Sequence, residues 1–69
     1  MYYSAWDNDL QQYFHTGRNS KSRKQCINEV LNMFNNDAEE DLFKLPEKER
    51  EEFLAECQYV KIHTHKRKI

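Results

Sequence analysis

Four cations stand together ahead of an amphipathic segment, and they are the side chains most able to bind an anion as a group. The stretch GRNSKSRK, residues 17–24, contains no acid and supplies Arg18, Lys21, Arg23 and Lys24. Peptide N–H groups at the start of a helix already attract anions, so cations around that start favour phosphate or carboxylate. No acid follows four positions after Arg23 or Lys24 to neutralise it. We therefore predict an anion-binding site at these residues, which we call the basic loop.

The anion that the basic loop meets can also come from the chain itself. Residues 37–52 hold eight acids and three bases, and this acidic segment can fold back on the loop or meet it across a homodimer. Exposed ion pairs contribute only about 0–1 kcal/mol each. Two solvated runs of opposite charge that attract each other weakly are therefore a further interpretation, and the sequence leaves all of these open.

A second group of basic residues lies at the C-terminus. Its members are Lys61, His63, His65, Lys66, Arg67 and Lys68. If this tail shared one side of the molecule with the basic loop, the two would form a stripe suited to phosphate contacts. The alternative is that residues 62–69 form a flexible basic tail that serves only to keep the chain solvated.

Cysteines and histidines are the remaining candidates for chemistry. Cys57, His63 and His65 form the closest set, but their spacing differs from the paired ligands typical of zinc sites. Cys26 and Cys57 fall on apolar helical stripes, where a thiol is expected to be free, buried and unreactive. We predict no metal, no cofactor and no catalytic residue, and hence no enzyme activity.

Aromatic residues offer a second kind of binding surface. Most of the four Phe, four Tyr and one Trp side chains are expected in the core. Tyr2, Tyr3 and Tyr59 are harder to bury, whereas Trp6 is also a core candidate. Tyr and Trp bury a large rigid area and keep a polar group, so we predict that Tyr2, Tyr3 and Trp6 anchor a partner near the two termini.

The elements that must position these residues read as helices. One Gly and one Pro in 69 residues argue against a fold built from strands and turns. Trp6, Leu10, Tyr13 and Phe14 recur at helical spacing, which predicts a helix over residues 5–16 that ends at Gly17.

Capping signals mark the later helices. Ser22 and Gln25 fit a capping box ahead of an apolar stripe, which predicts a second helix that closes at residues 35–36. Residues 37–45 predict a short third helix. Pro46 is suited to begin a fourth, which runs to about residue 60.

These elements predict a single all-α domain over residues 1–69, a small bundle of three to four short helices. The C-terminal residues from Val60 to Thr64 alternate between apolar and polar, however, which is a strand period. The only candidate partner strand is MYYSAW, residues 1–6. A short pairing of the two terminal segments therefore stays open.

The predicted function is a small, non-catalytic helical protein that binds another protein as a regulator, inhibitor or adaptor, with the basic loop steering it toward an acidic partner surface. The alternative is a sequence-independent nucleic-acid-binding protein that uses residues 18–24 and 61–68. No apolar run approaches the roughly 18 residues of a membrane helix, and the N-terminus lacks the pattern of a secretion signal. We therefore expect a cytoplasmic protein without membrane contact, and a homodimer stays open.

Overall fold

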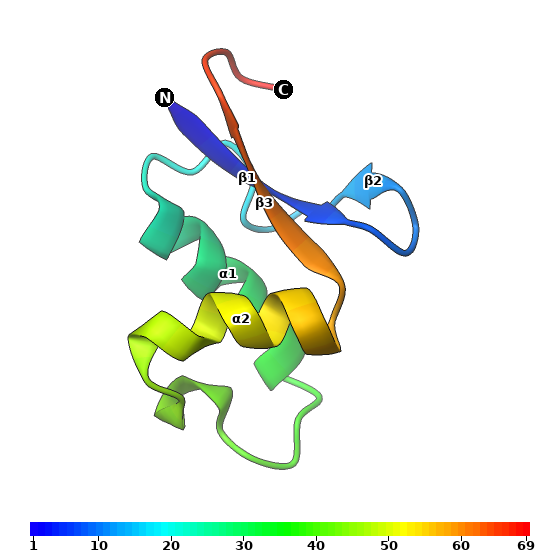
Figure 1. The fold of residues 1–69 in the computed structure, drawn as a ribbon, viewed down its shortest axis with the longest axis vertical. Helices are drawn as coiled ribbons and strands as arrows, with labels where there is room; N and C mark the ends of the chain where they lie inside the picture. Colours follow the sequence, from blue (N-terminus) through cyan, green and yellow to red (C-terminus); the bar gives the residue numbers. More distant parts are fainter.

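Two helices and a three-stranded antiparallel sheet make up the fold, which the computed structural model describes over residues 1–69. The elements follow in the order β1 (Tyr2–Asp7), β2 (Gln12–Tyr13), α1 (Arg23–Asn35), a short 3-10 helix (Leu42–Lys44), α2 (Glu47–Cys57) and β3 (Val60–His65). Figure 1 shows both helices on one side of the strands, with the two termini at the same end of the molecule. The predicted all-α bundle is therefore wrong, and the protein has an α+β fold.

The sheet has the strand order β2-β1-β3, so the two terminal segments of the chain are neighbours. Their register runs from the pair Tyr2–His65 to the pair Asp7–Val60. The terminal pairing that the sequence left open is thus present, and it is the longer of the two strand pairings in the sheet. Packing against the helices makes it stable, because a two-stranded ribbon alone is marginal in water.

The helix predicted over residues 5–16 is instead the β1–β2 hairpin and its continuation. Trp6 and Tyr13, seven positions apart, fit one helix face, but they are also direct cross-strand partners in this hairpin. The Asp7 carboxylate accepts from the backbone N–H groups of Asp9 and Leu10 at 2.9 and 3.1 Å. This side chain therefore stabilises the turn and competes with the helix. Leu10, expected in the core, is 65% exposed at that turn.

The second predicted helix is confirmed as α1. Ser22 has an extended backbone, and its hydroxyl accepts from the Gln25 N–H at 3.1 Å, which makes it the N-cap. The Gln25 side chain does not complete the capping box, because it donates to Glu29 at 2.9 Å. The buried face of α1 consists of Cys26, Ile27, Val30 and Leu31.

The chain between the helices is less helical than predicted. Only Leu42–Lys44 form a 3-10 turn, in which the Asp41 carboxylate accepts from the Phe43 N–H at 3.0 Å. Pro46 directly precedes α2, as its position suggested, but α2 ends at Cys57 and does not continue to residue 60.

One apolar core lies between the helices and the sheet. Its members are Ala5, Cys26, Ile27, Val30, Leu31, Leu54, Val60 and Ile62. Side chains alternate across a strand, so the core residues of β1 and β3 define the helix-facing side of the sheet, and their neighbours define an open face. Neither helix combines the length and the apolar composition that a membrane crossing requires.

Candidate functional site

The open face of the sheet carries aromatic, histidine and lysine side chains. In β1 and β3 the directly opposed pairs on this face are Tyr2–His65, Ser4–His63 and Trp6–Lys61. Tyr2, Trp6 and Tyr13 do not belong to the core or to the apolar residues packed against it. These rings therefore form a surface of their own, and the helices contribute nothing to it.

Three rings gather at one end of the open face. His63 stacks on Trp6 with ring centroids 5.3 Å apart and an interplanar angle of 18°. Tyr13 meets the Trp6 ring edge-on at 4.8 Å, and its hydroxyl is hydrogen-bonded to Nδ1 of His63 at 2.9 Å. All three side chains are half-buried. We call Trp6, Tyr13 and His63 the aromatic cluster.

A second pair of rings lies at the other end of the same face. Tyr2 and His65 stack with centroids 6.0 Å apart and an interplanar angle of 22°. The Lys68 ammonium lies over the Tyr2 ring, 5.9 Å from its centroid, within the range of a cation–π contact. The last residues of the chain thus return onto the open face and bring positive charge beside this pair.

A hydrogen-bond network fixes this return. The Ser4 hydroxyl is fully buried between the backbone N–H of Asn19, which donates to it at 2.8 Å, and Nε2 of His65, also at 2.8 Å. Nδ1 of His65 lies 2.6 Å from the Arg67 carbonyl. A carbonyl only accepts, so Nδ1 carries a proton, and Nε2 of neutral His65 accepts from Ser4.

The basic loop and the C-terminal tail meet at Asn19. Its side-chain amide donates to the Ile69 carbonyl at 3.0 Å, and its side-chain oxygen accepts from the Ile69 N–H at 2.9 Å. The tail expected over residues 62–69 therefore begins inside β3, and its last residue is joined to the loop. Sequence alone did not place loop and tail together, whereas the fold does.

The basic loop itself is divided. Arg23 turns toward α2 and donates to both carboxylate oxygens of Glu51, at 2.6 and 2.8 Å. Lys24 lies 3.5 Å from the Glu47 carboxylate. The premise that the chain leaves all four cations uncompensated therefore does not hold for Arg23 and Lys24, because the acidic segment folds back on them.

The Arg23–Glu51 pair also shifts the pKa of each group. The hydrogen bond to Glu51 raises the pKa of Arg23 further above its ordinary value. The same bond lowers the pKa of Glu51, so the carboxylate stays charged at lower pH. Arg18 and Lys21, in contrast, are exposed and form no ion pair.

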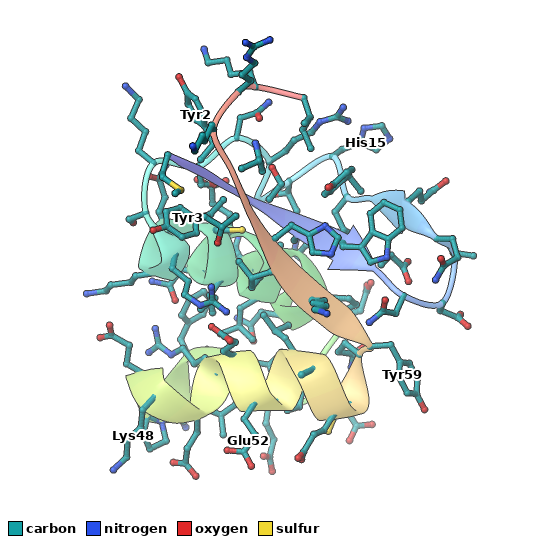
Figure 2. The ribbon with its side chains drawn as sticks, turned by 45° about the horizontal axis from the view of Figure 1, so that its top comes forward. Tyr2, Tyr3, His15, Lys48, Glu52 and Tyr59 are labelled. Carbon is teal, nitrogen blue, oxygen red and sulfur yellow. The ribbon has the colours of Figure 1, made fainter.

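The three aromatic residues predicted to anchor a partner lie on two different sides of the sheet. Tyr2 and Trp6 lie on the open face, but Tyr3 packs against the core on the helix side. Figure 2 shows Tyr2 near the C-terminal segment and Tyr3 directed toward α1, whereas Lys48 and Glu52 project from the far surface of α2. The molecule therefore has a basic aromatic face and, opposite it, an acidic helical one.

The cysteines and the remaining histidine lie away from this face. Cys26 is buried, its thiol donates to the Gly17 carbonyl at 3.2 Å, and burial raises its pKa to about 11. Cys57 is exposed at the end of α2, contrary to the expected burial. No group of three or more His, Cys, Asp or Glu side chains is arranged to hold a metal ion.

The sequence did not indicate that Tyr13, Ser4 and Asn19 belong to the open face or support it. Tyr13 was assigned to a helix core, although the Trp6–Tyr13 spacing also fits a hairpin with a four-residue turn. Ser4 directly precedes the helix predicted over residues 5–16, where a serine is typical of an N-cap. Asn19 has a positive φ of 55°, which Asn tolerates better than most residues. No signal in the sequence links it to Ile69.

Comparison with known proteins adds no relative. A scan against protein-family models and searches of curated proteins and solved structures found no match to this chain.

Proposed function

We propose that this protein binds single-stranded nucleic acid on the open face of its sheet. The observation that carries the proposal is the aromatic cluster, with Tyr2 and His65, outside the core and beside the C-terminal cations. Proteins that bind single strands combine aromatic side chains, on which bases stack, with a basic groove that follows the backbone. In a duplex the base faces are already stacked on one another, so they cannot stack on aromatic side chains of the protein.

The charges on this face support the same proposal. Lys61 stands beside Trp6 on the open face, and Lys68 lies over Tyr2. Lys66 and Arg67 lie between these two lysines in the chain. We call Lys61, Lys66, Arg67 and Lys68 the basic rim. Arg18 and Lys21 flank Asn19, which holds the end of the tail. Binding through such residues is largely independent of sequence, as the alternative prediction held.

The structure favours this function over docking to an acidic protein through the basic loop. Only Arg18 and Lys21 of the four loop cations remain free to steer a partner, because Arg23 and Lys24 are paired within the chain. The stacked rings of the open face are also better suited to stack on bases than to contact acidic side chains.

The decisive measurement uses Trp6, the single tryptophan of the chain, as an intrinsic fluorescent probe. We expect a single-stranded 12-mer of DNA or RNA to quench it, and a duplex of the same length to do so far less. The Trp6→Ala variant, measured with a labelled strand, is expected to lose about 1–3 kcal/mol of binding, whereas Trp6→Phe retains most of it. If all four basic-rim residues contact phosphates, raising salt from about 50 to about 200 mM weakens binding roughly 50-fold.

A charge-matched pair of variants controls for net charge. Lys68→Gln removes a cation from the basic rim, and Lys48→Gln removes one from the far surface of α2 (Figure 2). We expect only the first to weaken binding. Equal effects of the two variants, or no binding of any single strand at low salt, would refute the proposal.

A further inference from the structure

The outer edge of β3 is a second surface with unused binding capacity. The backbones of Tyr3 and Ala5 bond to residues 14–20 on the far side of β1, for example Ala5 N–H to the Gly17 carbonyl at 2.8 Å. The alternate residues of β1 therefore face β3 and engage Lys61, His63 and His65. The N–H and C=O groups of Ile62 and Thr64 consequently point to the outer edge, where no further strand lies.

A groove runs along this edge between β3 and α2. Its volume is about 330 Å³, and its apolar lining comes from Ala55, Val60 and Ile62. Lys61 and the Arg23–Glu51 pair border it. The groove leaves room for side chains of a strand added beside β3, on the side that faces the helices.

The alternation of side chains along such a strand decides which types of residue suit each of its two sides. Its side chains would alternate between the helix side and the open face, as those of β3 do. On the helix side they meet Ile62 and the groove, which suits small apolar residues. On the open face they meet Lys61, whose ammonium group suits an acid, and the rings of His63 and His65.

A second copy of the chain fits this edge poorly. Self-pairing would bring the Lys61 ammonium groups of the two copies onto the same face of one sheet, and like charges close together destabilise a sheet. Lysine on an edge strand is a common means of preventing such pairing. The charge pattern therefore favours a foreign strand over homodimerisation.

We propose that the β3 edge accepts an extended segment of another protein in which acidic and small apolar residues alternate. Main-chain hydrogen bonds to Ile62 and Thr64 provide the affinity. The groove selects small apolar side chains, and Lys61 selects acidic ones. This is the strand-addition mode of peptide recognition. This proposal does not rest on the nucleic-acid proposal, because its main-chain bonds use the edge of the sheet and not the rings of the open face; Lys61 alone is shared by the two surfaces.

The probe is a synthetic peptide, acetyl-Ser-Glu-Val-Glu-Val-Glu-Ser-amide, titrated into the ¹⁵N-labelled protein and followed by amide chemical shifts. We expect the largest shifts at Ile62 and Thr64. A peptide with Lys in place of each Glu is expected to bind at least about tenfold more weakly because it meets like charge. Equal binding of the two peptides would overturn the acidic part of the proposal.

N-methylated peptides test the pairing itself. In an antiparallel pairing, valines opposite Ile62 and Thr64 direct their N–H groups at β3, whereas the glutamates direct theirs away. Methylating the two valine nitrogens is therefore expected to abolish binding, and methylating the outer glutamate nitrogens to leave it nearly unchanged. If both methylated peptides bind alike, strand addition is excluded.

A protein variant gives the complementary test. Thr64→Pro removes an outward N–H without removing a bond to β1, since proline is tolerated at sheet edges when its position faces solvent. It is expected to abolish peptide binding, and Thr64→Val to preserve it. Unchanged binding by the proline variant contradicts the proposal. A concentration-dependent dimer that Thr64→Pro dissociates would also overturn it, because the edge would then belong to a second copy.

Discussion

His63 lies on the open face, where it contacts Trp6 and Tyr13 and is flanked along β3 by Lys61 and His65. Partial burial lowers its pKa below the ordinary value of 6.5, and Lys61 and His65 lower the pKa further. The neutral ring accepts from, or donates to, the Tyr13 hydroxyl while it stacks on Trp6. The lowered pKa of His63 therefore makes the stability of the folded protein depend on pH in the range where this histidine takes up a proton.

The sign of that pH dependence follows from the lowered pKa. The folded protein binds the proton of His63 less readily than the unfolded chain does, so this contribution to stability is fully present above about pH 6.5. It is lost as pH falls from there through the lower pKa of the folded state. We expect the decrease in melting temperature from about pH 7.5 to about pH 5.5 to be smaller in His63→Asn than in the wild type.

The control for this prediction is His15→Asn, because His15 is exposed and belongs to none of the three strands. Its melting temperature should respond to pH as the wild type does. A His63→Asn variant with an undiminished pH response would contradict the assignment. Protonation of His63 is expected to have the opposite effect on the proposed function, since it adds positive charge to the surface that would bind the polyanion.

At the scale of elements, Gly17 determines how closely the loop approaches α1. Its φ is +56°, a region that residues with a Cβ adopt at a cost. A Cβ built there would lie 2.4 Å from Cγ2 of Val30 and 2.9 Å from the Cys26 carbonyl oxygen. The loop that leads into α1 therefore depends on the absence of a side chain at this one position.

Gly17→Ala is accordingly expected to lower the free energy of unfolding by about 1–3 kcal/mol, because both the backbone strain and the overlap with α1 must be relieved by movement. Urea denaturation measures this loss. Arg18→Ala, at the exposed neighbouring position, is the matched control and should change stability by less than about 0.5 kcal/mol. Similar losses in the two variants would contradict the close contact.

At the scale of the whole molecule, the fold closes its two ends onto each other. β1 begins at Tyr2, β3 ends at His65, and the two strands pair over their full length. The tail then continues to Ile69, which Asn19 holds through two hydrogen bonds. Both proposed binding surfaces depend on this closure, because β3 supplies half of the open face and the whole free edge.

Asn19→Gly tests the closure of the tail, since Gly tolerates the positive φ at this position and removes both side-chain bonds. We expect the ¹⁵N heteronuclear NOE of Lys68 and Ile69 to fall while that of β3 stays constant. Asn19→Asp keeps the acceptor for the Ile69 N–H and should show a smaller effect. Unchanged order of the tail in Asn19→Gly would mean that other contacts hold it.

Much of the helical half of the fold could be predicted from the sequence, because its signals are local. Ser22 caps α1, an apolar stripe follows at helical spacing, and Pro46 precedes α2. The basic residues of the candidate site were also found, because charge is visible in composition. Their partners were not, since the ion pair between Arg23 and Glu51 joins residues of different helices.

Local signals in the sequence are enough to predict where α1 and α2 form and where the charges lie along the chain. Whether the N-terminal segment is a strand depends on long-range contacts, because Trp6 and Tyr13 satisfy a helix and a hairpin equally well. The backbone of this segment bonds on one side to residues 14–20 and on the other to β3, about sixty positions away along the chain. The same long-range pairing sorted Tyr2 and Trp6 from Tyr3, and so created the open face on which the proposed function depends.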